Sequence, residues 1–78
     1  MTINIHSFGQ QFTKEYEFLY ENRDMVAGYR EAVMAFDDAC NASEAFCKFV
    51  AEFSKYRGDY ISSDREAAAF MFALDTLS

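Results

Sequence analysis

Asp37 and Asp38 are adjacent carboxylates in the stretch MAFDDAC, near the middle of the chain. Paired carboxylates carry general acid–base catalysis when both side chains converge on one reacting group. Neighbouring residues on a helix, however, point about 100° apart and do not face one another. The pair therefore offers two separate negative charges rather than a catalytic dyad.

The other side chains with catalytic or metal-binding chemistry are few and scattered. His6 is the single histidine, and Cys40 and Cys47 stand seven positions apart, which is not a zinc-site spacing. The three glycines are too dispersed to form a phosphate-binding loop. We therefore predict a non-enzymatic protein with no cofactor and no metal site. The cysteines are interpreted as buried small apolar residues, and a disulfide requires the intervening turn to bring their Cα atoms close.

A row of acidic side chains is the feature that points most directly to a function. Asp24, Glu31 and Asp38 recur every seven residues, so on a helix they share the face opposite the apolar stripe. Seven residues rise about 10.5 Å, close to the spacing of every third phosphate along one DNA strand. The predicted partner-binding residues are Asp24, Glu31, Met34, Asp37 and Asp38. Their expected partner is a protein with a basic surface that handles nucleic acid; the alternative is an ordinary solvated face.

Three large apolar side chains, Phe18, Met34 and Phe72, lie off the predicted core stripes of their helices. A second apolar stripe indicates another buried contact, and aromatic and methionine side chains are typical interface anchors. One interpretation is an interface, either with a second copy of the chain or with another protein. A self-interface predicts a homodimeric structural or regulatory bundle without nucleic-acid mimicry. The other is that a small bundle with short loops wraps these residues into a broad core.

The composition narrows the class of partner. The 78 residues include 13 acids and 7 bases, which gives a net charge of −6, so direct binding to nucleic acid or to an anionic membrane is not expected. The opening MTINIHSFGQ lacks the basic and apolar segments of a signal peptide, and the apolar run AAAFMFAL is too short to span a membrane. We expect a cytoplasmic protein with reduced cysteines.

Helical periodicity predicts the elements that position these residues. Apolar side chains at helical spacing predict a first helix over 7–22, starting at Ser7, and a second over 24–40, with Gly28 in its interior. The apolar arcs place Tyr20 in the core of the first helix and Tyr56 in the core of the third.

Capping signals predict two further helices. The stretches NASE, with Asn41 as the cap, and SDRE both fit the capping box. The third helix is expected to end near Arg57 because Gly58 is a typical C-terminal stop. The fold class is an all-α bundle of three to four helices. The chain is divided into an N-terminal arm, 1–6, and a single helical domain, 7–78.

In size, acidity and predicted helix count the chain resembles the acyl carrier proteins. That family attaches its phosphopantetheine arm to the serine of an Asp-Ser-Leu motif at the start of the second helix. Here the second helix opens N-R-D-M-V, so the attachment serine is missing and this function is not expected. The profile is also similar to that of small phage and mobile-element proteins that inhibit host machinery, including nucleic-acid mimics directed against restriction or CRISPR enzymes. This similarity implies an inhibitor that blocks the basic surface of a host defence or regulatory protein.

Overall fold

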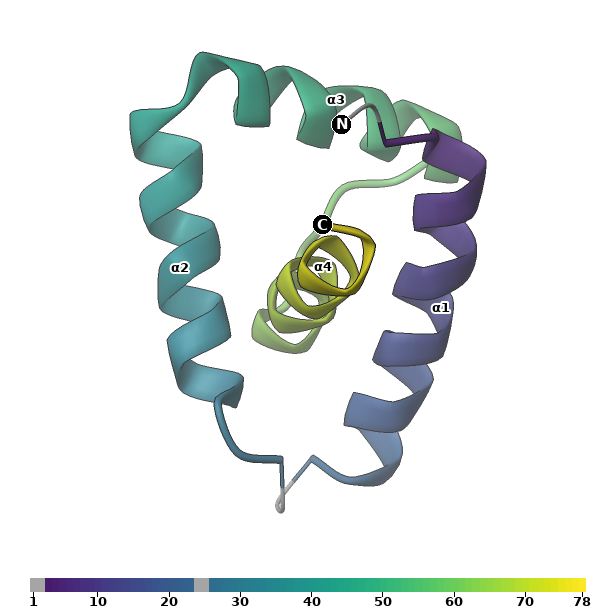
Figure 1. Ribbon diagram of the computed structural model, residues 1–78, viewed down its shortest axis with the longest axis vertical. Helices are drawn as coiled ribbons and strands as arrows, with labels where there is room; N and C mark the ends of the chain where they lie inside the picture. Colours follow the sequence, from purple (N-terminus) through teal and green to yellow (C-terminus); the bar gives the residue numbers. More distant parts are fainter. Residues whose placement is uncertain (1–2, 24–25) are drawn as a thin grey trace.

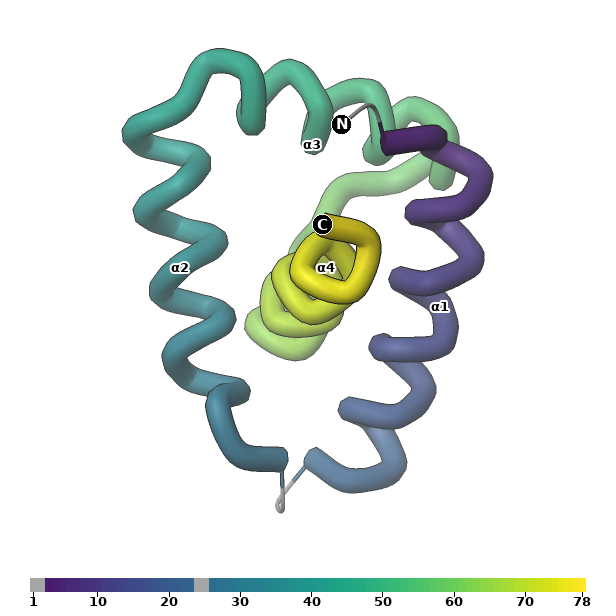
Figure 2. The backbone as a smooth tube through the Cα atoms, in the orientation of Figure 1, coloured from purple at the N-terminus to yellow at the C-terminus, as the bar shows by residue number. Residues whose placement is uncertain are grey.

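The computed structural model describes residues 3–23 and 26–78, and this part of the chain contains four α-helices. They are α1 (Ile5–Glu21), α2 (Tyr29–Ala42), α3 (Glu44–Arg57) and α4 (Asp64–Leu77). Helices α1, α2 and α3 form three sides of a frame, and α4 runs through its middle, nearly end-on in Figure 1. The chain follows α2 and α3 around the frame before it turns inward to α4 (Figure 2). The predicted all-α bundle is confirmed.

Helix α4 is the centre of the core. Ala68, Ala69, Phe70 and Ala73 have no exposed surface, because the frame covers this helix on several sides. A helix that is apolar nearly all round is stable only when it is buried in this way. Helices α1 and α2 both pack along α4, and no Cα atom of α1 lies within 8 Å of a Cα atom of α2. Among the described helices, none is both long enough and apolar enough to cross a membrane.

Helix α1 begins at Ile5, two residues before the predicted start at Ser7. Asn4 caps it, because the Asn4 Oδ1 atom accepts hydrogen bonds from the backbone N–H groups of His6 (2.8 Å) and Ser7 (3.2 Å). These N–H groups belong to the first turn and have no partner within the helix. Ile5 and His6, predicted as part of the N-terminal arm, are therefore helical.

Helix α2 begins at Tyr29, five residues later than predicted. Gly28 has a φ of +82°, a left-handed conformation that glycine adopts at little cost and that cannot continue a right-handed helix. Gly28 is therefore the residue before the helix and does not lie inside it, so that prediction was wrong.

A single extended residue, Ser43, separates α2 from α3. The Ser43 hydroxyl accepts a hydrogen bond from the backbone N–H of Phe46, at 3.2 Å, and so caps α3. The predicted cap, Asn41, instead lies in the last turn of α2. The second capping signal was placed correctly, since Ser63 caps α4 by accepting a hydrogen bond from the N–H of Glu66 at 3.1 Å.

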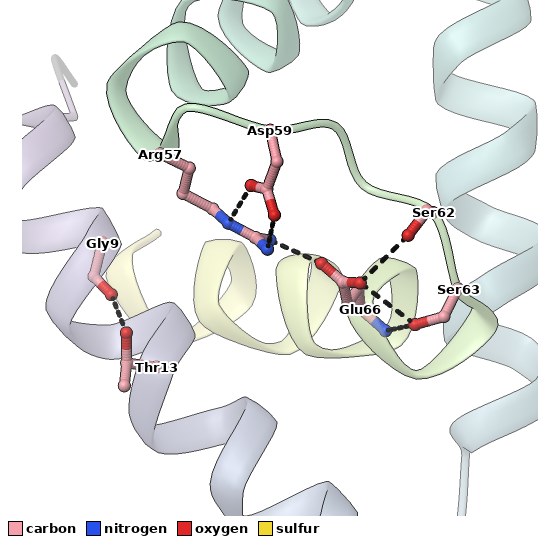
Figure 3. Close-up of polar contacts among 7 residues, drawn as sticks. All are labelled: Gly9, Thr13, Arg57, Asp59, Ser62, Ser63 and Glu66. Carbon is pink, nitrogen blue, oxygen red and sulfur yellow. Dashed lines mark hydrogen bonds and ion pairs between the residues drawn. The ribbon is translucent and has the colours of Figure 1, made fainter.

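Arg57, in the last turn of α3, holds the turn between α3 and α4 (Figure 3). Its guanidinium group bonds both carboxylate oxygens of Asp59, at 2.9 and 3.0 Å, and one oxygen of Glu66. It also lies over the ring of Phe12, 5.3 Å from the ring centroid. Burial opposes the charge on Arg57, but the hydrogen bond and charge of Glu66, together with Asp59, outweigh it and raise the Arg57 pKa.

Candidate protein-binding surface

The outward side of α2 carries the predicted acidic residues. Glu31, Asp37 and Asp38 are exposed, and Met34 exposes 60% of its surface. Met34 follows Glu31 by three positions and precedes Asp38 by four, so its side chain lies between these two carboxylates. We refer to Glu31, Met34, Asp37 and Asp38 as the acidic face of α2. The fifth predicted partner-binding residue, Asp24, lies outside the described residues.

The carboxylates of the acidic face have no ion-pair partner within residues 3–23 and 26–78. The ion pairs found there join Arg57 to Asp59 and to Glu66. The helix itself contains three acids and one base, the exposed Arg30, and so has a net charge of −2. Its carboxylates are therefore available to cations on another molecule.

Asp37 and Asp38 lie further from the end of α2 than the sequence predicted, because the helix continues to Ala42. The effect of the helix dipole falls off within the last turn. Carboxylates near the C-terminal end of a helix oppose its dipole, and at this distance from the end Asp37 and Asp38 do so only weakly. Asp37 and Asp38 are exposed, and they differ from Asp59 and Glu66 because they have no ion-pair partner among the described residues.

Phe18, Met34 and Phe72 do not form one surface. Phe18 is 53% exposed on α1 and Met34 is 60% exposed on α2, and these helices lie on opposite sides of α4 (Figure 1). Phe72 is half-buried and packs against the core. The broad-core interpretation therefore describes Phe72, whereas Phe18 and Met34 remain exposed on separate helices.

Two tyrosines that the apolar arcs placed in the core are exposed instead. Tyr20 exposes 54% of its surface and Tyr56 exposes 49%. The guanidinium carbons of Arg23 and Arg65 lie 5.4 and 5.6 Å from the centroid of the Tyr20 ring. Both tyrosines lie at the edge of their arc, where one side of the ring packs on the domain and the rest is exposed. The Tyr56 hydroxyl also lies within hydrogen-bond distance of the Nδ1 atom of His6, at 3.3 Å. Spacing alone does not separate such an edge position from a core position.

Cys40 and Cys47 meet at the corner between α2 and α3. The Cys47 thiol donates a hydrogen bond to the backbone oxygen of Cys40, at 2.8 Å. Cys40 is half-buried and Cys47 is exposed, so the prediction that both are buried was wrong for Cys47. Burial, followed by the charges of Cys47 and Asp37, raises the pKa of the Cys40 thiol. In the part of the chain that the structure describes, no three His, Cys, Asp or Glu side chains gather where they would hold a metal ion.

Comparisons of this chain with models of known protein families, with characterised proteins and with solved structures found no match. The function of this chain is therefore inferred from the exposure, spacing and charge of its surface residues.

Proposed function

We propose that this protein is a small acidic binding protein that docks the acidic face of α2 on the basic surface of a protein that handles nucleic acid. The observation that carries the proposal is that Glu31, Asp37 and Asp38 are all exposed and lack an ion-pair partner among the described residues. By occupying a basic groove, the protein would exclude the nucleic acid that the groove normally holds. It would then act as an inhibitor, as phage and mobile-element proteins of similar profile do.

The spacing of the carboxylates supports this kind of partner. Glu31 and Asp38 are separated by seven residues, a rise of about 10.5 Å along α2. Successive phosphates of one strand are about 3.4 Å apart along the DNA axis, so lysine and arginine side chains that hold every third phosphate would meet carboxylates at this interval. Exposed ion pairs contribute only about 0.2–1 kcal/mol each, so the charges chiefly steer and orient the complex. Met34, between the two carboxylates, provides an apolar contact that the partner can bury.

The double substitution Asp37→Lys with Asp38→Lys should weaken binding at least about tenfold, because two attractive charges become repulsive. Both residues are exposed, so the fold should be unchanged. The partner would be captured on the tagged protein from host lysate at low salt, eluted by a salt step and identified by mass spectrometry. The affinity of the purified pair would then be measured at several salt concentrations, with and without competing DNA or RNA.

A matched control is the double substitution Glu17→Lys with Glu21→Lys. It makes the same change in net charge at two exposed positions of α1, on the other side of α4. We expect this control to bind within a few-fold of the original protein. Equal weakening by both variants would show that net charge alone drives binding, and unchanged binding by the α2 variant would exclude the acidic face.

A homodimeric bundle is the second candidate function, favoured by the 53% exposure of Phe18. It predicts a solution mass twice 9.0 kDa and a melting temperature that rises with protein concentration. Phe18→Glu should then return the mass to that of a monomer without disturbing the core. A monomeric original protein at high concentration would contradict this candidate.

A further inference from the structure

We propose that Cys40 and Cys47 form a reversible redox pair, which closes to an intrachain disulfide and thereby links α2 to α3. The observation that carries this inference is the position of the Cys47 sulfur, 2.8 Å from the backbone oxygen of Cys40. The inference concerns the corner of the frame and does not depend on the proposed partner.

The hydrogen bond limits the distance between the two Cα atoms. The Cα atom of Cys40 lies about 2.4 Å from its own carbonyl oxygen, and a cysteine sulfur lies about 2.8 Å from its own Cα. With the 2.8 Å hydrogen bond between them, a straight path would span about 8 Å. The path bends at the oxygen and at the sulfur, which brings the Cα atoms toward the range of about 4.4–6.8 Å found in disulfides.

The architecture of the corner holds this arrangement in place. Cys40 lies in the last turn of α2, Cys47 lies at the end of the first turn of α3, and Ser43 is the single residue between the helices. The Ser43 N–H donates to the oxygen of Ala39, and the Cys47 N–H donates to the oxygen of Ser43. These bonds tie both helix ends to the connection. To close the disulfide, the Cys47 sulfur must turn from the backbone oxygen of Cys40 to the Cys40 sulfur.

The chemistry requires an oxidant, and a small disulfide such as oxidised glutathione supplies it. The Cys47 thiolate attacks one sulfur of the oxidant, breaks its S–S bond and releases one thiolate. The Cys40 thiolate then attacks the Cys47 sulfur and expels the second thiolate, so two electrons and two protons pass from the protein to two small thiols. Cys47 is exposed and reacts first, whereas Cys40 is half-buried and its pKa is raised by that burial.

The first test treats the folded protein with oxidised glutathione, blocks remaining thiols with an alkylating reagent and measures the intact mass. The original protein should lose two hydrogens, remain monomeric and keep no reactive thiol. Cys40→Ser should instead retain one glutathione on Cys47, because no second thiol can release it. Cys47→Ser should react at least about tenfold more slowly, because its remaining thiol is half-buried.

Thermal melting supplies a second readout. A disulfide that closes a loop of this length should raise the melting temperature by roughly 10–20 °C, and a dithiol reductant should reverse the change. Neither serine variant should show the shift. The proposal would be overturned if the original protein accumulated bound glutathione, as Cys40→Ser should, or formed only disulfide-linked dimers. It would also be overturned if the intrachain disulfide formed only in denaturant.

Discussion

Phe70→Ala is expected to lower the melting temperature by at least about 12 °C. Phe70 has no exposed surface, and its ring centroid lies 4.5 to 6.2 Å from those of six other phenylalanines. These are Phe8, Phe12, Phe36, Phe46, Phe49 and Phe53. Removing such a ring costs about 3–5 kcal/mol, against a total of about 4–12 kcal/mol for a domain of this length.

The measurement is a thermal melt followed by circular dichroism, with a urea titration to obtain the free energy of unfolding. Phe18→Ala is the matched control, because it removes the same atoms from a side chain that is 53% exposed. Its expected change is within about 0.5 kcal/mol. If the two variants melted at the same temperature, Phe70 would not be the centre of the core.

Arg57→Ala is expected to destabilise the fold by about 2–3 kcal/mol. The Glu66 side chain is only 12% exposed, and the substitution removes the cation that pairs with it. A partly buried carboxylate without its cation retains the cost of desolvation and loses the compensating attraction. The contact of the guanidinium with Phe12 and its two bonds to Asp59 disappear at the same time.

Lys55→Ala tests whether this effect comes from Arg57 itself or from the loss of any cation at the end of α3. Lys55 lies in the same last turn, is exposed and has no ion pair among the described residues. Its loss should cost about 0.3–1 kcal/mol through the helix dipole alone. Urea unfolding of both variants measures the two losses. Equal free energies of unfolding would show that the contacts of Arg57 with Glu66, Asp59 and Phe12 do not stabilise the fold.

The helical class and several helix ends could be predicted from the sequence because the decisive signals are local. Ser63 caps α4 and Gly58, with a φ of +86°, ends α3, both as predicted. A capping serine and a left-handed glycine act within one turn of their own position. Gly28 was misassigned because a glycine flanked by apolar residues fits a helix interior as well as a turn. Only the backbone, with its φ of +82°, separates these cases. Asn41 and Ser43 likewise compete to cap α3, and their spacing does not decide between them.

The central position of α4 could not be predicted in the same way. Periodicity assigns each helix one buried stripe, whereas burial of four consecutive residues, Ala67 to Phe70, depends on the frame that surrounds them. The exposure of the acidic face could be anticipated, because unpaired charges remain in water. The contact between Cys40 and Cys47 could not be anticipated, because it depends on the angle that the extended residue Ser43 imposes between α2 and α3.

The central place of α4 has a consequence for protein synthesis. A ribosome makes the chain from its N-terminus at roughly 5–20 residues per second, so α4 emerges after the three helices that enclose it. Until then the rings of α1 and α3 lack Phe70 as a partner. They can still meet one another, since the ring centroid of Phe8 lies 5.0 Å from that of Phe49 and 5.1 Å from that of Phe53. The core of the nascent chain is therefore incomplete until α4 arrives, and the apolar surface that α4 covers stays open to solvent and to chaperones until then.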